Sequence, residues 1–325
     1  MMAEKILDIK DLKVEYHTDG AVIYAVNGVS LTLNKGETLG LVGETGAGKT
    51  TIARSIMRIL PTPPAKLCGG TIEFEGEQIL DLHEKQMRKI RGNKIAMIFQ
   101  DPMTALNPIE TVGFQISETI RVHDRVSRAE AEKRAMHMLE MVGIPMERFN
   151  EYPDQFSGGM KQRVVIAMAL ACNPELLLAD EPTTALDVTI QAQVLDRIQL
   201  LKKQLGTSVI LITHDLGVVA SCCDKVAVIY GGQIVESGTL EHIFDYPTHP
   251  YTIGLFNSRP KLDSKERRLK PIKGLMPNMR EIKQGCYFCD RCDKAMDCCK
   301  TEAPEYVEVQ PGHLVKCHLM KKEEG

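Results

Sequence analysis

One glycine-rich segment carries residue types that bind phosphate. Residues Gly43, Glu44, Thr45, Gly46, Ala47, Gly48, Lys49 and Thr50 follow the pattern G-x-x-x-x-G-K-[ST]. Glycines let backbone N–H groups converge on phosphate oxygens, and a helix that begins here points its positive end at the same anion. Lys49 would reach the outer phosphates and the Thr50 hydroxyl would bind Mg²⁺. The segment, extended to Thr51, therefore predicts a nucleoside triphosphate site.

A second group of polar residues follows two apolar runs. Asp180 and Glu181 come directly after residues 176–179, and His214 follows residues 209–213. Ligands bind at the carboxyl ends of parallel strands, so we expect these side chains near the phosphates. Asp180 is the expected Mg²⁺ ligand and Glu181 is placed to polarise an attacking water. A histidine at a strand end is often structural, and His214 needs further support.

The elements that must position these residues alternate between strands and helices. We expect buried strands at residues 39–42, 176–179 and 209–213, because each is a short apolar run. Helices are expected from Lys49 to about Leu60, stopped by Pro61, and through Ile190 to Leu201, ended by Gly206. This alternation predicts an α/β fold with a largely parallel sheet.

The rest of the chain divides into an insert and a C-terminal part. Residues of about 101–160 have helical character, and Ser127 with Glu130 has the spacing of a capping box. After about Pro250 the alternation fades, and a charged, proline-containing stretch follows. We expect a nucleotide-binding domain over residues 1–257 and a linker with a small irregular cysteine-rich module over residues 258–325.

Composition limits the classes of function. The chain has 325 residues, 43% of them hydrophobic, and a net charge of −3, which gives no case for a nucleic-acid partner. No stretch approaches the roughly 18 apolar residues of a transmembrane helix, and the N-terminus lacks a signal-peptide layout. We therefore expect a cytoplasmic location and read the ten cysteines as thiols or metal ligands.

The segment Phe156 to Arg163, which reads FSGGMKQR, resembles the signature sequence of ABC ATPases. Ser157 can cap the helix that runs to about Cys172, and Gly158 and Gly159 expose its first N–H groups, so this is a second anion site. The resemblance implies a P-loop ATPase core of ABC type with a helical insert. It also implies two such domains paired head to tail, each closing its signature over the ATP bound by the other.

Further positions match the same family in its order. Tyr16 looks like the aromatic residue that stacks on adenine, with Tyr24 as a competitor and a plain strand aromatic as the alternative. Gln100 resembles the Q-loop glutamine, which implies a catalytic role at the reacting phosphate and a third Mg²⁺ ligand beside Thr50 and Asp180. Asp187 fits the D-loop. His214 fits the switch histidine that contacts the γ-phosphate.

Three features narrow the resemblance: residues 99–108, Met160 where most signatures have glutamine, and residues 248–252. They are similar to the ATPases of oligopeptide and dipeptide importers, and nickel importers share much of this. The resemblance implies ATP-driven import from the cytoplasmic face of the membrane. The implied partners are two integral-membrane permease subunits, a second, related ATPase or another copy of this chain, and indirectly a solute-binding protein.

Six cysteines crowd the end of the chain. Cys286, Cys289 and Cys292 have the spacing of iron-sulfur ligands, and zinc is the rival because His313 and His318 lie near Cys317. By resemblance to the importer family, Cys286, Cys292, Cys299 and Cys317 imply an iron-sulfur cluster of the [4Fe-4S] type. Cys289 and Cys298 are extra and stand as alternate ligands, and free thiols are the remaining alternative.

Two other classes of function compete. One is an ABC ATPase that acts on ribosomes or DNA, but such proteins usually carry paired ATPase domains or long coiled coils, and this sequence shows neither. The other is a sensor whose iron-sulfur centre regulates an inactive ATPase. Competent residues fill all the catalytic positions, which argues against it.

Overall fold

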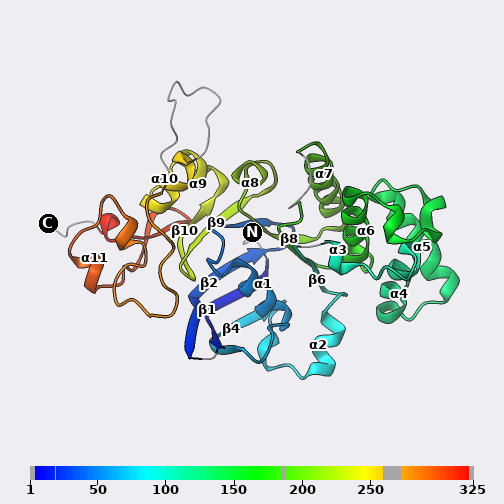
Figure 1. Cartoon of the computed structure of the whole chain (residues 1–325), viewed down its shortest axis with the longest axis horizontal. Coiled ribbons are helices and arrows are strands. Elements are labelled where there is room, and N and C mark those ends of the chain that lie inside the picture. Colours follow the sequence, from blue (N-terminus) through cyan, green and yellow to red (C-terminus); the bar gives the residue numbers. More distant parts are fainter. Residues whose placement is uncertain (1–3, 19, 101, 184–187, 259–271, 322–325) are drawn as a thin grey trace.

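The computed structural model describes residues 4–18, 20–100, 102–183, 188–258 and 272–321. Its N-terminal part is an antiparallel sheet with strand order β2-β1-β4-β5. The bounds are Lys5–Thr18 for β1, Ala21–Asn34 for β2, Ala65–Phe74 for β4 and Glu77–Gln78 for β5. In Figure 1 this sheet lies beside α1 (Lys49–Met57), so it borders the segment that contains the glycine-rich motif.

The second sheet has strand order β11-β12-β10-β9-β3-β8-β7-β6. β3 lies in its middle and pairs in parallel with both β8 and β9, and β7 pairs in parallel with β8 and β6. The bounds are Thr38–Val42 (β3), Ile95–Ile98 (β6), Leu176–Asp180 (β7), Ser208–Thr213 (β8), Lys225–Tyr230 (β9), Gln233–Thr239 (β10), Tyr306–Gln310 (β11) and His313–Lys316 (β12). The predicted α/β fold with a parallel core is confirmed.

Helices cover this sheet and build the insert. Their bounds are Glu84–Ile90 (α2), Pro102–Ala105 (α3), Val112–Asp124 (α4), Arg128–Met141 (α5), Gly158–Leu170 (α6), Val188–Leu205 (α7), Leu216–Cys222 (α8), Leu240–Asp245 (α9), Pro250–Asn257 (α10) and Cys298–Thr301 (α11). Short 3₁₀ turns occupy Ile79–Asp81, Met146–Asn150, Pro153–Gln155, Cys289–Arg291 and His318–Met320.

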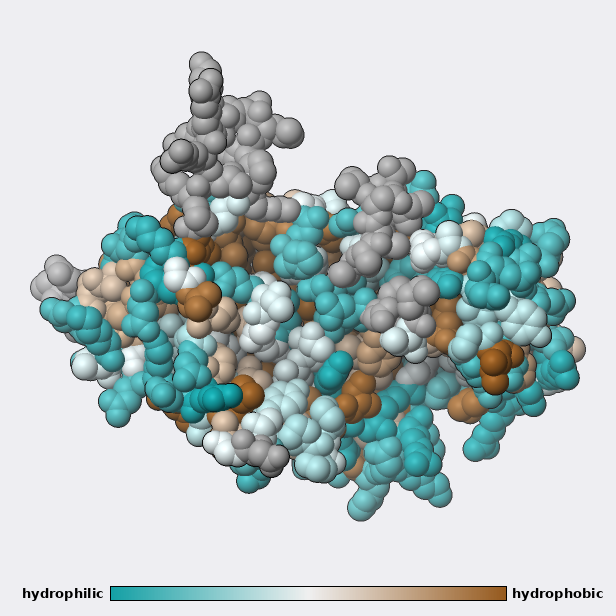
Figure 2. Space-filling view, viewed as in Figure 1, coloured by the Kyte–Doolittle hydropathy of each residue, from teal (hydrophilic) through white to brown (hydrophobic). Residues whose placement is uncertain are grey.

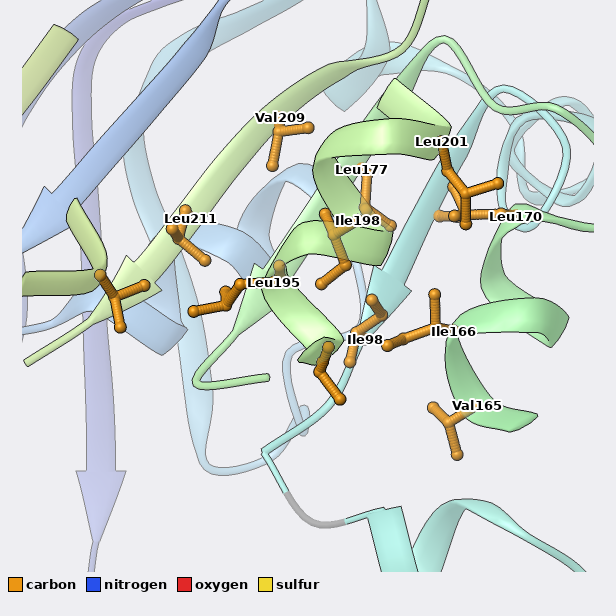
Figure 3. Packing of buried hydrophobic residues seen from close by; sticks show 14 of the residues in the cluster. Ile98, Val165, Ile166, Leu170, Leu177, Leu195, Ile198, Leu201, Val209 and Leu211 are labelled. Carbon is orange, nitrogen blue, oxygen red and sulfur yellow. The ribbon is translucent and has the colours of Figure 1, made fainter. Parts of the chain in front are cut away.

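Two hydrophobic clusters form the core on the two faces of the large sheet. One contains Leu177, Val209 and Leu211 from the strands with Leu195 and Ile198 from α7, and Figure 3 shows these side chains packed between helix and sheet. The other contains Leu41, Leu178 and Ile210, which face α1 and the N-terminal sheet. Strands buried on both faces read as continuous apolar runs, which is why the sequence located them.

The helix ends follow local capping chemistry. Ser127 Oγ accepts a hydrogen bond from the Glu130 backbone N–H (3.2 Å), which is the serine half of the predicted capping box. α7 ends just before Gly206. α1 ends at Met57, earlier than the predicted Leu60, because Arg58 adopts a left-handed conformation with φ of 51°. Its backbone N–H caps the carbonyls of Arg54 and Ser55.

The C-terminal part joins the large sheet. β12 pairs with β10, and β11 pairs with β12, so the last strands extend the sheet at the edge opposite β6. In Figure 1 this part and the insert of α4 and α5 lie at opposite ends of the molecule. The face in Figure 2 is mostly hydrophilic, with hydrophobic residues in separate small patches. Within the described residues, no helix is long and apolar enough to cross a membrane.

Candidate functional site

The glycine-rich segment forms the turn between β3 and α1, and its glycines are required by close backbone contacts. A Cβ atom at Gly43 would lie 2.2 Å from the Ile229 carbonyl oxygen. At Gly48, where φ is 102°, a Cβ atom would lie 2.4 Å from the Ala25 carbonyl oxygen. Both distances exclude a side chain, so this turn can form only with glycine at these two positions.

Lys49 is folded back onto this turn. Its Nζ donates to the carbonyl oxygens of Gly43 (2.8 Å) and Glu44 (2.9 Å), and the residue is 6% exposed. Burial lowers the pKa of the Lys49 ammonium, although three nearby carboxylates oppose the shift, those of Glu181, Asp180 and Glu44. The ammonium is therefore held by weak neutral acceptors, which phosphate oxygens can replace.

Thr50 and Asp180 meet at the end of β7. Thr50 Oγ1 donates to Asp180 Oδ1 at 3.2 Å, and Asp180 is almost fully buried. Burial raises the pKa of this carboxyl, and the Thr50 hydrogen bond partly offsets the shift. A hydroxyl and a carboxylate are hard oxygen donors of the kind that Mg²⁺ takes together with phosphates. Thr50 and Asp180, two of the three predicted Mg²⁺ ligands, are adjacent and suit that ion.

Two further predicted residues contact the side chain of Glu181. Gln100 Nε2 donates to Glu181 Oε2 at 3.0 Å, and His214 Nδ1 lies 3.2 Å from Glu181 Oε1. Glu181 itself has φ of 47°, and its backbone N–H donates to the Ile212 carbonyl. The ends of β6, β7 and β8 thus bring an amide, a carboxylate and an imidazole together beside the phosphate turn, the name used from here on for the glycine-rich turn of residues 43–50.

The two aromatic candidates for adenine contact differ in position. Tyr16 Oη lies 3.3 Å from Thr51 Oγ1, at the first turn of α1, and the ring is half-buried. Tyr24 donates its backbone N–H to the Met279 carbonyl, which places it against the C-terminal part. Tyr16 is thus the aromatic residue in direct contact with the predicted nucleotide-binding segment.

The signature segment is open to its surroundings. Ser157 Oγ accepts from the Met160 backbone N–H at 3.4 Å and so caps α6, as predicted. Ser157 and Gly158 are exposed, and a Cβ atom at Gly158 would meet nothing within 4 Å. The first turn of α6 can therefore receive an anion from outside the chain. Asp187 lies outside the described residues.

Sequence reasoning missed two contacts to the phosphate turn. Arg291 forms a bidentate ion pair with Glu44, with distances of 2.8 and 3.0 Å. The Glu44 backbone N–H donates to Tyr251 Oη at 3.0 Å. No local pattern could find these pairs, because their partners lie more than 200 residues apart. Tyr251 belongs to residues 248–252, a segment that the sequence singled out for its resemblance to importer ATPases and not for this contact.

The cysteines of the C-terminal part gather around one small cavity. Cys286, Cys289, Cys292, Cys299 and Cys317 line it, together with His249 and His318. Cys298 is not among these residues. Burial, together with smaller contributions from the neighbouring Cys299 and Cys317, raises the pKa of the Cys286 thiol to about 11. Several buried thiols with mutually raised pKa values form a soft, sulfur-rich donor set.

The histidines that would serve zinc have other partners. His313 Nε2 lies 2.8 Å from Glu236 Oε1, and both residues are fully buried. His318 Nε2 lies 2.9 Å from the Glu302 carbonyl oxygen. Among the described residues, no group of three or more His, Cys, Asp or Glu side chains is arranged as a metal site. The cysteines therefore offer the chemistry of a metal centre without a preformed geometry.

Comparisons with known proteins agree with this geometry. The ABC transporter family matches residues 26–184, and the oligopeptide/dipeptide transporter C-terminal region matches residues 235–299. A dimeric post-hydrolysis ATP-binding cassette bound to ADP and phosphate is similar with a TM-score of 0.65 and 30% identity, over 72% of this chain and 99% of that one.

Curated relatives match over nearly the whole chain. A probable peptide ABC transporter ATP-binding protein of Sinorhizobium fredii is 52% identical over 97% of this chain and 95% of its own length. The oligopeptide transport ATP-binding protein OppD of Bacillus subtilis is 50% identical, over 97% and 89%. The dipeptide transport ATP-binding protein DppD of the same organism is 49% identical, over 97% and 95%. The chain belongs to the ABC transporter ATP-binding proteins of the oligopeptide and dipeptide transporter family.

Proposed function

We propose that this chain hydrolyses ATP to power the import of dipeptides and oligopeptides through a membrane permease. The observation that carries the proposal is the meeting of Gln100, Glu181 and His214 at the carboxyl edge of the sheet, beside the phosphate turn. These three side chains follow the ends of three different strands and meet at one point. The importer-type C-terminal region supports peptides as the cargo.

The site residues divide the hydrolysis reaction between them. Lys49 exchanges its two carbonyl acceptors for phosphate oxygens, and the turn's N–H groups complete the phosphate contacts. Thr50 and Asp180 hold Mg²⁺, which neutralises charge on the phosphates. Glu181 accepts a hydrogen bond from a water and takes its proton as that water attacks the γ-phosphorus, while the bond from the γ-phosphorus to the β–γ bridging oxygen breaks and ADP leaves. Gln100 and His214 hold the carboxylate in line for this step.

A complete site needs a second ATPase domain. The first turn of α6 at Ser157 and Gly158 is exposed and can bind an anion, and a head-to-tail partner would bring ATP to it. The partner is either a related ATPase or a second copy of this chain.

A permease contact is proposed at an apolar groove beside Gln100. The groove has a volume of about 250 Å³ and is lined by Met57, Met97, Phe99, Ala105 and Met168, among others. Phe99 is 41% exposed and directly precedes Gln100. A short cytoplasmic helix of a permease fits such a groove, and its movement would reach Glu181 through Gln100. The chain would then act at the cytoplasmic face of the membrane.

We further propose that the cysteine cavity holds an iron-sulfur cluster of the [4Fe-4S] type, with Cys286, Cys292, Cys299 and Cys317 as ligands. The Met296 backbone N–H lies 3.5 Å from Cys299 Sγ, and N–H contacts to sulfur are common around such clusters. Cys289 also lines the cavity and is the alternate ligand, whereas Cys298 lies outside it. Iron and sulfide analysis of anaerobically purified protein, compared with its zinc content, tests this assignment. Serine at Cys298 should keep the iron, and serine at Cys299 should lose it.

An uptake experiment tests the cargo. Cells that lack this chain should lose uptake of labelled dipeptides and oligopeptides, and the wild-type gene should restore it. Lys49→Ala should fail to restore it, because the phosphate contacts are lost. Retained peptide uptake with lost nickel uptake would identify a nickel importer. Co-purification with nucleic acid, and with no membrane protein, would contradict a transport role altogether.

A further inference from the structure

An ion pair ties the phosphate turn to the cysteine-rich C-terminal part of the chain. The guanidinium of Arg291 donates from Nη1 to Glu44 Oε2 (2.8 Å) and from Nη2 to Glu44 Oε1 (3.0 Å). Only 7% of the Arg291 side chain and 27% of the Glu44 side chain are exposed. A bidentate and largely shielded pair fixes both orientation and charge, unlike most ion pairs on a protein surface.

The surroundings hold Arg291 in this position. Its Nε donates to the Lys273 carbonyl at 2.9 Å, and its guanidinium lies 5.7 Å from the centre of the Tyr230 ring. Tyr230 packs against Tyr251 and Phe288, with ring centres 4.6 and 5.2 Å away. Tyr251 in turn accepts the Glu44 backbone N–H. Arg291 therefore binds the side chain of Glu44, and Tyr251 binds its backbone.

Glu44 is the second residue of the phosphate turn. Its carbonyl oxygen accepts from Lys49 Nζ at 2.9 Å, the atom expected to meet the outer phosphates. A free carboxylate on this residue would stand close to the triphosphate and repel it, because like charges in a shielded site interact strongly. Arg291 removes that repulsion by neutralising the carboxylate and by drawing it away towards Tyr230.

We propose that Arg291 is a positioning residue for ATP binding, which neutralises and orients Glu44 so that the phosphate turn accepts the triphosphate. The inference rests on the proposed nucleotide site and adds a contribution from the cysteine-rich part to it. Arg291 lies between Cys289 and Cys292, in a 3₁₀ turn where the Arg291 backbone N–H donates to the Phe288 carbonyl. A change in the conformation of the cysteine cluster would move this turn and thus alter ATP affinity.

Equilibrium binding of MgATP to nucleotide-free full-length chains tests the proposal. Arg291→Gln should weaken ATP binding by about five- to tenfold, the lower end of the usual range for coupled sites. The loss should shrink at high salt, because it is a repulsion between charges. Glu44→Gln combined with Arg291→Gln should bind ATP within about twofold of the wild type, because both charges are absent. Arg291→Lys keeps the charge and should recover most of the affinity.

Asp290→Asn is the matched control. Asp290 is the neighbour of Arg291, pairs with Lys283 and does not touch Glu44. This variant should bind ATP like the wild type. Thermal unfolding of every variant shows whether a change in affinity reflects a loss of fold. If Arg291→Gln does not fold, Arg291→Lys and the double variant still carry the comparison.

The outcomes separate this inference from the proposed function. The inference is wrong if Arg291→Gln binds ATP as tightly as Asp290→Asn, or if the double variant is as weak as Arg291→Gln. A merely structural role for Arg291 would give that second result, since removing a further charge cannot restore packing. If the wild type binds no better than Lys49→Ala, the proposed nucleotide site itself fails.

Discussion

Glu181 shows how single residues are prepared for chemistry in this site. Its carboxylate is contacted by Gln100 on one oxygen and by His214 on the other. Both contacts fix the direction in which the carboxylate faces, so little reorganisation is needed when a water arrives. The same contacts also explain why three positions far apart in the sequence act as one unit.

Replacing Glu181 by Gln should therefore separate binding from hydrolysis. The amide keeps the size of the side chain but cannot take a proton, and we expect ATP turnover to fall by at least about 100-fold. Nucleotide affinity should stay within a few-fold of the wild type. Phosphate release and equilibrium ATP binding measure the two effects. Undiminished hydrolysis would rule out Glu181 as the base.

The burial of Asp180 predicts that its charged form, which Mg²⁺ binding requires, lowers the stability of the fold. Burial raises the pKa of its carboxyl in the folded chain. The unfolded state then binds fewer protons than the folded state, so this group's contribution to stability falls as pH rises from the unfolded pKa through the folded one. Near neutral pH the charged form is a net cost to folding.

Asp180→Asn should thus raise the melting temperature of the nucleotide-free chain while it abolishes Mg²⁺-dependent hydrolysis. The Asn Oδ1 atom can still accept the Thr50 hydrogen bond. Calorimetry without nucleotide and ATPase assays with Mg²⁺ check the two effects. Thr50→Val is a useful comparison, because it removes the hydrogen bond and keeps the carboxylate. A lower melting temperature for Asp180→Asn would contradict the argument.

At the scale of elements, a buried carboxylate anchors α10 to the sheet. Glu236 on β10 accepts the backbone N–H groups of Thr248 (2.8 Å) and His249 (3.0 Å), and contacts His313 of β12. His249 Nδ1 then caps α10 by accepting the Tyr251 backbone N–H at 3.0 Å. Through Glu236, this network joins the importer-like segment 248–252 to His313 of β12.

The cap predicts a loss of stability in mild acid. Burial lowers the pKa of His249 from 6.5 to about 4. The unfolded chain takes up a proton near pH 6.5 and the folded chain does not until about pH 4, so the folded state loses stability as pH falls through that window. The loss in the free energy of unfolding is roughly 3 kcal/mol for a pKa shift of this size. Above this window, the contribution of His249 to stability should not change with pH.

His249→Asn should reduce this acid sensitivity, because asparagine caps a helix and does not titrate. Urea unfolding at pH 7.5 and at pH 5 measures it, and the wild type should lose about 2 kcal/mol between the two values. The variant should lose clearly less. An equal loss in both chains would assign the acid sensitivity to other groups.

The sequence predicted elements where local pattern decides structure. β3, β7 and β8 are continuous apolar runs, and the spacing of Gly43 and Gly48 located the phosphate turn. The contacts that require glycine there, with the carbonyls of Ile229 and Ala25, are long-range and were not visible in the sequence. β1 and β2 were not foreseen, because irregularities in their register break the alternation of apolar and polar residues. The addition of β12 to β10 and the Arg291–Glu44 pair were also missed, since both depend on long-range packing.

In the proposed pairing with a second ATPase domain, the whole molecule supplies one half of the assembly. Its phosphate turn and its signature helix each present an anion site, and the first turn of α6 is exposed. Such a surface predicts association that depends on ATP, because the nucleotide supplies the negative charge both sites attract. The similar cassette bound to ADP and phosphate is a dimer.

Gly158→Asp tests this arrangement. A Cβ atom at Gly158 meets nothing within 4 Å, so the variant should fold and bind ATP as a monomer. The new carboxylate would repel the partner's ATP, and ATP-dependent dimers should be lost. Size-exclusion chromatography with light scattering, in the Glu181→Gln background and with the related ATPase if one is needed, measures association. Dimers that persist in Gly158→Asp would contradict the role of the signature helix.

The position of β3 has a consequence for protein synthesis. Val42, the last residue of β3, pairs with Val228 of β9, which the ribosome adds much later. At about 5–20 residues per second this interval lasts roughly 10–40 s. The other parallel neighbour of β3, which is β8, is synthesised late in the same interval, so β3 has neither parallel neighbour for most of it. A nascent chain must therefore keep one of its most apolar strands without its parallel neighbours for most of that time, which makes this segment a natural contact for chaperones.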